Sequence, residues 1–285
     1  MQMKKIDQTR QWLTKNLSLL RCPKCGRAFV TVLDYSLACQ QGHVWNLNKK
    51  GFVYFLDHAA PGEYDRENLA DRRNVLQAGM FQPMIEQVAQ YIPTEPQTIL
   101  DIGTGEGTPL YQLMQARPAH HDTYLGFDIS KAGVQLATQL DPNLFFCVAD
   151  LRQLPFADAS MSTIVEFFSP SDYQEFKRVL KPGGQVLKII PNADYLIELR
   201  HLLYPTGEKR TYDNSAVVQR FAENYPTMQM VPIKYEFSLA PELRASLVQM
   251  SPLHWGKGAR KLTTTDLAQL TQVTIDVSLL IGRDN

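Results

Sequence analysis

"TILDIGTGEG", residues 98–107, joins an apolar run to three alternating glycines, Gly103, Gly105 and Gly107. An apolar run that ends at a glycine predicts a buried strand, and residues 107–116 are expected to continue as a helix. A glycine-rich turn between a strand and a helix lets the backbone approach a bound nucleotide closely. The segment therefore predicts the first strand and the cofactor loop of a nucleotide-binding α/β domain.

Alternating helices and strands follow this loop. Further strands are expected at residues 123–130, 144–150, 162–168, 185–191, 227–239 and 271–284, and helices at residues 131–140, 171–180, 240–250 and 263–270. Such alternation is typical of a parallel sheet with helices on both faces. Seven strands with a terminal pair fit a class I, Rossmann-like methyltransferase domain better than a six-stranded dehydrogenase sheet. We place this domain at residues 97–285.

The chemistry of the loop separates the same two classes. A dinucleotide fingerprint needs Gly or Ala at position 108, where this chain has Thr108. The carboxylate of Glu106 would also repel a pyrophosphate. S-adenosylmethionine has no phosphate and carries a cationic amine and a sulfonium, so an acidic loop suits it. The loop therefore predicts S-adenosylmethionine as the cofactor.

Acidic residues stand at the ends of three successive predicted strands. Asp101 ends the first strand, Asp128 the second and Asp150 the third. A carboxylate at Asp128 can accept hydrogen bonds from the ribose hydroxyls, and Asp150 is placed to contact the adenine. One such aspartate alone would be read as a helix cap. Three of them beside the glycine loop predict one cofactor crevice. The expected cofactor-binding residues are Asp101, Gly103, Gly105, Glu106, Gly107, Asp128, Asp150 and Leu151.

Three of the four cysteines and one histidine lie close together near the front of the chain. The spacing is Cys22-x2-Cys25, thirteen residues, then Cys39-x3-His43. Each short knuckle supplies two of the four tetrahedral ligands that Zn²⁺ prefers. The four residues therefore predict one structural zinc ion with no open coordination position. The alternative is a chance cluster of free thiols. The residues between the knuckles alternate as in a β-hairpin. We assign residues 1–56 to a zinc-binding module and residues 57–96 to a linker and a helix.

Positive charge is concentrated in the same module. Residues 1–50 carry nine lysines and arginines against two aspartates, a net charge of +7, so the rest of the chain carries −7. A basic front end on an acidic body predicts a polyanionic partner. No uncharged apolar run approaches the roughly 18 residues of a membrane span. Residues 1–11 have the basic residues of a signal peptide, but no apolar segment follows them. We expect a cytoplasmic protein without a membrane partner.

These features together resemble the RlmA-type 23S ribosomal RNA (guanine-N1) methyltransferases. The resemblance rests on the zinc knuckles and on the following segments: "RRNVLQAGMFQP" (72–83), "LDIGTGEG" (100–107), "FDISKAGVQLA" (127–137), "LPFADASM" (154–161), "LKPGGQV" (180–186), "YLIELRHLLY" (195–204) and "LVQMSPLHW" (247–255). It implies methylation of N1 of one guanine in a hairpin of 23S rRNA, with the zinc module recognising RNA. It also implies that Gly105 and Glu106 contact the cofactor and that Phe81 and Tyr195 help to enclose it.

The sequence assigns no catalytic base. Guanine N1 carries a proton that a base or water must remove. Base methyltransferases often place their key residues at the end of the fourth strand, where this chain has "EFFSPSD", residues 166–172. Its candidates are Phe167 or Phe168 for stacking, Ser169 for a hydrogen bond, and Glu166 or Asp172 as the base. Phe167 and Phe168 fit a core equally well, and Asp172 fits a helix cap.

Two other functions are compatible with parts of the chain. The segment "ADLRQLPFADASM" also resembles quinone-pathway methyltransferases, which act on small molecules. That reading does not explain the basic zinc module. A non-enzymatic RNA-binding assembly factor would explain the module, but the intact glycine loop with Asp128 argues against it. The sequence leaves both a monomer and an oligomer open.

Overall fold

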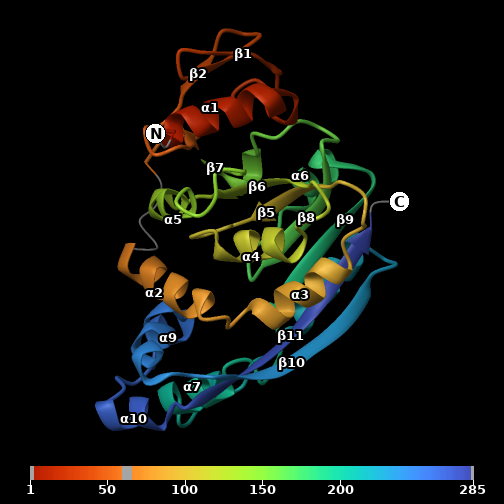
Figure 1. Ribbon diagram of the computed structural model, residues 1–285. Helices are drawn as coiled ribbons and strands as arrows, with labels where there is room; N and C mark the ends of the chain where they lie inside the picture. Colours follow the sequence, from red (N-terminus) through yellow and green to blue (C-terminus); the bar gives the residue numbers. More distant parts are fainter. Residues whose placement is uncertain (1–2, 60–65, 284–285) are drawn as a thin grey trace.

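The computed structural model describes residues 3–59 and 66–283, which form a large mixed sheet and a small antiparallel one (Figure 1). In the large sheet the strand order is β10-β11-β9-β8-β5-β6-β7-β4, with β4, β7, β6, β5, β8 and β9 parallel and β11 and β10 antiparallel. The strands are β4 (Val53–Tyr54), β5 (Thr98–Ile102), β6 (Thr123–Asp128), β7 (Leu144–Val148), β8 (Met161–Phe167), β9 (Leu180–Pro191), β10 (Gln229–Ser238) and β11 (Gln272–Arg283).

Strands β5 to β11 confirm the predicted seven-stranded methyltransferase sheet with its terminal antiparallel pair. The eighth strand, β4, was not predicted, because two residues are too short to show a periodic pattern. It adds to the β7 edge, with Val53 opposite Cys147 and Tyr54 opposite Val148. This strand lies within residues 1–56, so the predicted zinc module contributes backbone to the catalytic sheet.

Ten α-helices occur in the described residues. They are α1 (Lys5–Asn16), α2 (Arg66–Gln77), α3 (Gln82–Gln90), α4 (Thr108–Ala116), α5 (Lys131–Ala137), α6 (Tyr173–Val179), α7 (Ile197–Leu203), α8 (Ser215–Asn224), α9 (Arg244–Met250) and α10 (Thr264–Gln269). Of the helices that the structure describes, none has the length and apolar character that crossing a membrane requires. Helices α7 and α8 were not expected from the sequence, whereas α4, α5, α6, α9 and α10 fall where they were predicted.

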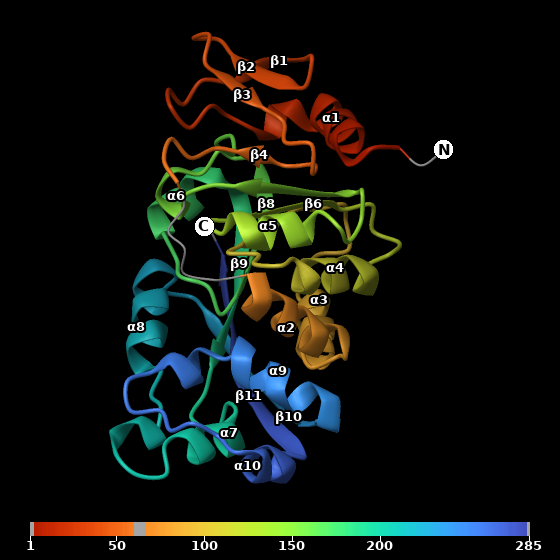
Figure 2. The ribbon, with the colours of Figure 1, turned by 90° about the vertical axis from the view of Figure 1, so that its left-hand side faces the viewer.

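The large sheet is covered on both faces, as the strand pattern requires. Along β7, Phe146 and Val148 face one apolar cluster, while Phe145 and Cys147 face the other. This alternation follows from the two-residue period of a strand. Helices α2, α3, α4, α5, α7 and α9 contribute to the first cluster, and α1, α6, α8 and the N-terminal module contribute to the second. Figure 2 shows α8 on the opposite side of the sheet from α2, α3 and α4.

The N-terminal module is a three-stranded antiparallel sheet formed by β1 (Phe29–Leu33), β2 (Ser36–Cys39) and β3 (Val44–Asn46). The predicted hairpin corresponds to β1 and β2, which turn through Asp34 and Tyr35 in the left-handed region at φ 43° and 65°. The module lies at one end of the molecule, at the top of Figures 1 and 2, beside β7 and β4.

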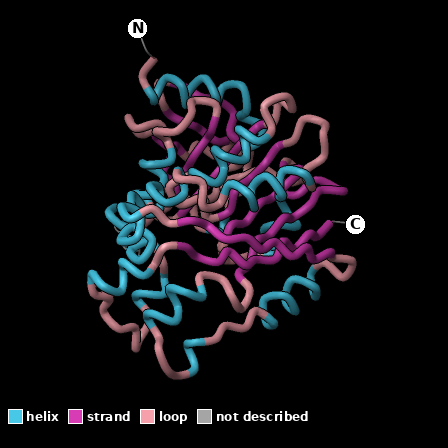
Figure 3. The backbone as a smooth tube through the Cα atoms, turned by 60° about the horizontal axis from the view of Figure 1, so that its bottom comes forward, coloured by secondary structure: helices cyan, strands magenta, loops and turns pink. Residues whose placement is uncertain are grey.

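Helix α1 joins this module to the catalytic sheet. The indole of Trp12 stacks on the ring of Phe145 in β7, with centroids 4.5 Å apart and planes inclined by 11°. Trp12 and Leu13 are both buried in the cluster that also contains Phe29 and Trp45 of the module. Figure 3 traces the same chain as a smooth tube, with its helices in cyan and its strands in magenta. Stacking of α1 on the sheet therefore fixes the position of the module.

We expect Trp12→Ala to lower the free energy of unfolding by about 3–5 kcal/mol, because it removes a buried ring from a packed cluster. Urea unfolding followed by circular dichroism measures this change. Trp255→Ala is the matched control, since that side chain is 42% exposed. A loss below about 1 kcal/mol for Trp12→Ala would contradict the anchoring role of α1.

Candidate functional site

The glycine loop between β5 and α4 has the backbone conformation that its sequence predicts. Gly103, Gly105 and Gly107 adopt φ values of 64°, 57° and 84°, which side-chain-bearing residues rarely reach. A Cβ at Gly103 would come within 2.8 Å of Ser169 Oγ, and one at Gly107 within 2.7 Å of Ala137 Cβ. A Cβ at Gly105 would have no atom within 4 Å. Gly105 therefore borders open space, as a loop that receives a ligand should.

Asp128, at the end of β6, holds this loop in place. Its Oδ2 accepts a hydrogen bond from Gly105 N at 2.8 Å, and its Oδ1 accepts one from Ser130 N at 2.7 Å. Burial raises the pKa of Asp128, although the two backbone N–H groups lower it. The carboxylate thus shapes the loop and, at the same time, lines the cavity described below.

A cavity of about 1010 Å³ opens at the carboxyl ends of the parallel strands. Ligands of α/β sheets bind at this edge. Of the residues predicted to bind the cofactor, the following lie on its wall: Gly103, Gly105, Asp128, Asp150, Leu151 and Tyr195. Asp150 caps a short 3-10 helix, η2 (Leu151–Gln153), and accepts a hydrogen bond from Arg152 N at 2.9 Å. The predicted loop and strand-end residues are therefore together in one crevice.

Four other predicted cofactor residues are not on the cavity wall. Asp101, in β5, and Gly107, at the end of the loop, are both buried, and burial raises the pKa of Asp101 to about 7. Glu106 is fully buried and forms an ion pair with Arg73 Nε at 3.1 Å. Its carboxylate also accepts hydrogen bonds from the backbone N and the hydroxyl of Thr108. Glu106 thus fastens the loop to α2, and its contact with the cofactor stays a prediction.

Phe81 is the fourth of these residues, and it supports the cavity from behind. It is fully buried, with its ring centroid 5.4 Å from that of Phe168. Phe168 lies 5.1 Å from Tyr195, and both of these rings line the cavity. Phe168 adopts φ 64°, a strained conformation for a bulky residue that is usually retained where a site requires it.

Helix α2 supplies cavity residues that the sequence analysis did not assign. Asn68, Leu69 and Arg72 line the cavity, and the guanidinium of Arg72 lies 5.5 Å from the ring centroid of Phe81. Arg72 lies in the segment "RRNVLQAGMFQP", which carries part of the family resemblance, whereas Asn68 and Leu69 precede that segment. Their contact with the crevice depends on the packing of α2 against α9, α5 and α4, which no local pattern predicts.

The segment after β8 contains the residues considered for catalysis. Phe167, Phe168 and Ser169 line the cavity. Asp172 caps α6 by accepting hydrogen bonds from the N–H groups of Gln174 and Glu175, which is the cap interpretation of the sequence. Its side chain is therefore engaged at the helix terminus.

Glu166 lies below the cavity wall rather than on it. It is fully buried and pairs with Lys188 Nζ at 3.1 Å, while the Ser171 hydroxyl donates to it at 2.8 Å. Burial raises the pKa of Glu166 to about 7 against the attraction of Lys188. Lys188 also donates to the carbonyl oxygen of Ser169 at 2.8 Å. The pair thus holds the Ser169–Ser171 turn, and a role for Glu166 as base stays a prediction.

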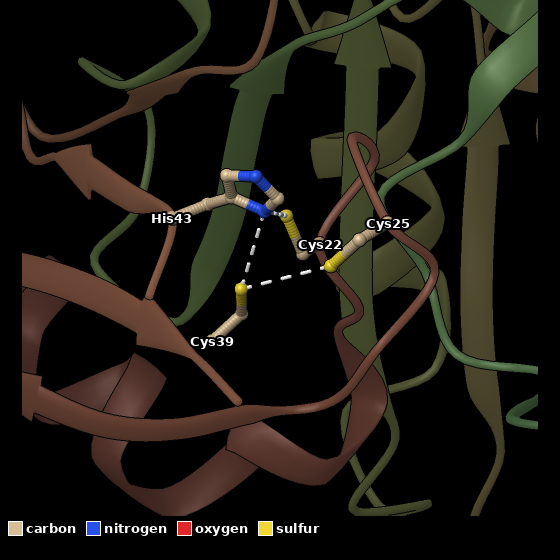
Figure 4. Close-up of side chains that lie close together, drawn as sticks. All are labelled: Cys22, Cys25, Cys39 and His43. Carbon is tan, nitrogen blue, oxygen red and sulfur yellow. Dashed lines mark hydrogen bonds between the residues drawn. The ribbon is translucent and has the colours of Figure 1, made fainter. Parts of the chain in front are cut away.

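The predicted metal ligands Cys22, Cys25, Cys39 and His43 lie together in the N-terminal module (Figure 4). One ligand atom from each residue lies within 4.8 Å of all the others. The distances are 3.6 Å from Cys22 Sγ to His43 Nδ1, 3.7 Å from Cys25 Sγ to Cys39 Sγ, and 3.5 Å from Cys39 Sγ to His43 Nδ1. Ligand atoms around a tetrahedral zinc ion lie about 3.5–3.8 Å apart, as its bond lengths require. The cluster can therefore hold one zinc ion.

Backbone turns place these ligands. Gly26 N donates to Cys22 O at 2.8 Å, and Gly42 N donates to Cys39 O at 2.9 Å, so each knuckle closes on itself. The indole N–H of Trp45 donates to Cys22 Sγ at 3.5 Å, a contact from outside the cluster that helps to orient this ligand. Three thiolates and one imidazole fill a tetrahedral zinc sphere, so the predicted role is structural.

Comparisons with known proteins agree with this geometry. Residues 99–184 match the model of a methyltransferase domain. The protein YxjB of Bacillus subtilis (strain 168), assigned as a 23S rRNA (guanine-N(1)-)-methyltransferase, is 34% identical over 94% of this chain and 98% of its own. The 23S rRNA (guanine(748)-N(1))-methyltransferase of Streptomyces fradiae is 26% identical over 93% of this chain and 96% of its own. A solved N-methyltransferase of Haemonchus contortus, bound to phosphomonomethylethanolamine and S-adenosylhomocysteine, matches with a TM-score of 0.51 at 12% identity, over 81% of this chain and 62% of its own.

The sheet order, the glycine loop and the crevice beside it define a class I methyltransferase that uses S-adenosylmethionine. The fit of the cofactor rests on the open space at Gly105 and on the carboxylates of Asp128 and Asp150 in the wall. Because the similarity to YxjB extends over nearly the full length of both chains, this chain belongs to the family of 23S rRNA (guanine-N(1)-)-methyltransferases.

We expect Gly105→Val to abolish binding of S-adenosylhomocysteine, because its side chain would enter the cavity. Calorimetric titration measures the affinity. Gly183→Val is the matched control, since Gly183 has φ 75° and also borders open space, but does not line the cavity. It shares the backbone strain of about 1–3 kcal/mol and should retain the ligand. Equal affinities for the Gly105 variant and the wild type would place the cofactor elsewhere.

Asp128→Ala should weaken S-adenosylhomocysteine binding by roughly 1.5–3 kcal/mol, the usual contribution of a hydrogen bond to a charged acceptor. The variant also loses the bond that holds Gly105. Asp158→Ala, which removes a 66%-exposed carboxylate outside the cavity, is the control for the same titration. An unchanged affinity for Asp128→Ala would show that this carboxylate does not contact the cofactor.

Purified wild-type protein should contain one zinc ion per chain, and Cys39→Ala should lose most of it. Elemental analysis by mass spectrometry gives the ratio. Cys147→Ala is the control, because it removes the one cysteine outside the cluster. Absence of zinc from wild-type protein prepared without chelators would refute the metal site.

Proposed function

We propose that this protein transfers the methyl group of S-adenosylmethionine to N1 of one guanine in a hairpin of 23S rRNA, in the cytoplasm. The observation that supports this most strongly is the near-full-length similarity to named 23S rRNA (guanine-N(1)-)-methyltransferases. A small-molecule methyltransferase would match over the catalytic domain alone. The match to these rRNA methyltransferases covers more than nine-tenths of the chain, so it includes the basic module and supports RNA as the partner of that module.

The bound cofactor would supply an electrophilic methyl group on a sulfonium. The residues of the chain then act by positioning, because in-line transfer depends on orientation more than on covalent chemistry. The loop at Gly105 and the carboxylate of Asp128 would hold the nucleoside end. Phe168 and Tyr195 offer aromatic faces beside it, and their rings are well suited to a flipped base.

The N-terminal module has the charge distribution of an RNA-binding surface. Arg27, Lys49 and Lys50 are exposed, and none of them forms an ion pair with the residues that the structure describes. Lys24 is also exposed, but it pairs with Asp57 at 3.1 Å. Free cations on a small, rigid module can bind phosphates and set the register of an RNA, while the catalytic domain acts on one base.

Primer extension across 23S rRNA tests the proposed function. N1-methylguanine cannot form a Watson–Crick pair, so reverse transcriptase stops at it. Total RNA from cells that lack the gene should lose one stop, and incubation with purified protein and S-adenosylmethionine should restore it at the same guanine. An identical stop pattern with and without the gene would refute the proposal.

Replacement of Lys24, Arg27, Lys49 and Lys50 by glutamine should weaken binding to a 23S rRNA hairpin fragment and flatten its salt dependence. Each lost phosphate contact removes about 0.7–0.9 from the slope of log affinity against log salt. Filter binding across a salt series measures the slope. Methylation at saturating RNA should largely persist, because the cofactor crevice is unchanged.

The control for this experiment is the pair Lys181→Gln and Arg283→Gln. Both cations are exposed and lie at the opposite edge of the sheet from the glycine loop. Their loss should leave the slope unchanged. If the quadruple variant has the slope of the wild type, the basic module does not bind RNA phosphates, and its lysines serve only solubility.

A further inference from the structure

The cavity extends well beyond the crevice beside the glycine loop. At its other end, the wall is formed by α7 and by two 3-10 helices, η3 (Glu208–Arg210) and η5 (Pro252–Trp255). Its total volume of about 1010 Å³ lies at the upper end of the range for sites that hold a single drug-sized ligand. The far end, which we call the outer chamber, therefore offers space for a second molecule beside the cofactor.

Arg200 in α7 is the buried charged group of the outer chamber, whereas Glu208 and Lys209 of η3, which also line it, are exposed. Its residue is only 8% exposed, and it lines the cavity. Nη1 donates to the carbonyl oxygen of Lys209 at 3.1 Å, whereas Nε is buried without a hydrogen-bond partner in the described structure. Arg200 forms no ion pair with any carboxylate among those residues. A buried cation is normally paired, so this guanidinium lacks its partner.

Aromatic rings surround this guanidinium. The ring of Tyr212 has its centroid 5.5 Å from Arg200 Cζ, and Tyr204 lines the same chamber. The hydroxyl of Tyr204 donates to the carbonyl oxygen of Leu253 at 2.6 Å, which fixes this ring against η5. Leu196, one turn before Arg200, connects the chamber to Tyr195 and Phe168. An apolar and aromatic slot with one buried cation at its wall suits a planar base that carries hydrogen-bond acceptors.

Guanine matches these donors better than the other bases. Its O6 and N7 are adjacent acceptors that an arginine binds in a bidentate manner, whereas adenine presents an amino group in place of O6. The reaction adds a second reason. When N1 loses its proton to water or a base, the negative charge extends onto O6, where a guanidinium would stabilise it. N1 then takes the methyl group, and the C–S bond breaks to leave a neutral thioether.

We propose that the outer chamber binds the target guanine and that Arg200 is its specificity residue, with the guanidinium donating to O6 and N7 of the flipped base. This inference rests on the proposed function, because it requires a guanine substrate. The alternative ligand of Arg200 is a backbone phosphate next to the target guanine. In that case Arg200 would contribute to affinity for RNA and not to base specificity.

Binding to matched RNAs separates these two roles. The probes are 23S rRNA fragments that span the guanine located by primer extension and carry guanine, adenine or an abasic sugar at that position. Dissociation constants are measured with S-adenosylhomocysteine present, so that no turnover occurs. Arg200→Gln should bind the guanine fragment about 5- to 150-fold more weakly than wild type, the range for one bidentate base contact. On the abasic fragment the two proteins should have equal affinities.

The adenine fragment provides a second comparison. Wild type should prefer guanine over adenine, and Arg200→Gln should reduce this preference. Arg244→Gln is the matched control: Arg244 also donates from Nη1 to one carbonyl oxygen and also has an unpartnered buried Nε, but it does not line the cavity. It should bind all three fragments as wild type does.

If Arg200→Gln loses affinity equally for the guanine and abasic fragments, the inference is overturned in favour of a phosphate contact. If Arg200→Gln does not fold, as judged by thermal unfolding and S-adenosylhomocysteine affinity, Arg200→Lys decides. A lysine cannot span two acceptors, so the Arg200→Lys variant should bind the abasic fragment as wild type does and the guanine fragment more weakly. A variant that keeps the full preference for guanine would overturn the inference. A wild-type protein that produces no stop in 23S rRNA would instead refute the proposed function.

Discussion

The hydrogen bond from Gly105 N to Asp128 Oδ2 is the contact on which the rest of the site depends. It joins the loop after β5 to the end of β6, and it holds Gly105 in a conformation that leaves open space beside the backbone. The ion pair of Glu106 with Arg73 then ties the same loop to α2, which brings Asn68, Leu69 and Arg72 to the cavity. A rigid loop with these neighbours gives a cofactor one defined orientation, which methyl transfer requires.

The module and the catalytic domain are connected more closely than a boundary at residue 56 suggests. Strand β4 extends the catalytic sheet, and Trp12 of α1 stacks on Phe145 of β7. The module that carries the four zinc ligands is therefore packed directly against the catalytic sheet. Bound zinc, which contributes on the order of 10 kcal/mol to folding in such modules, would fix the basic surface relative to the cavity. In this arrangement, RNA phosphates and the target base would be recognised at separate sites of one rigid body.

The elements predicted best from the sequence are those whose signals are local. The strand and glycine pattern of residues 98–107 and the spacing of Cys22, Cys25, Cys39 and His43 depend on neighbours in the chain, and the structure places them as expected. Contacts between distant segments could not be predicted in this way. Glu106 turns toward Arg73, thirty-three residues away, and Arg200 lies on the cavity wall because α7 packs against β11. Strand β4 was missed because its pairing with β7, and not its own two residues, defines it.

Transfer of a methyl group to N1 of a guanine in 23S rRNA is tested most directly by mass spectrometry of nucleosides. For this test, 23S rRNA from cells lacking the gene is incubated with the protein and methyl-deuterated S-adenosylmethionine and is then digested to nucleosides. We expect deuterated 1-methylguanosine, at no more than one per rRNA molecule, and no other deuterated nucleoside. Label in a different methylated nucleoside, or no label in RNA that wild-type cells do methylate, would contradict this function.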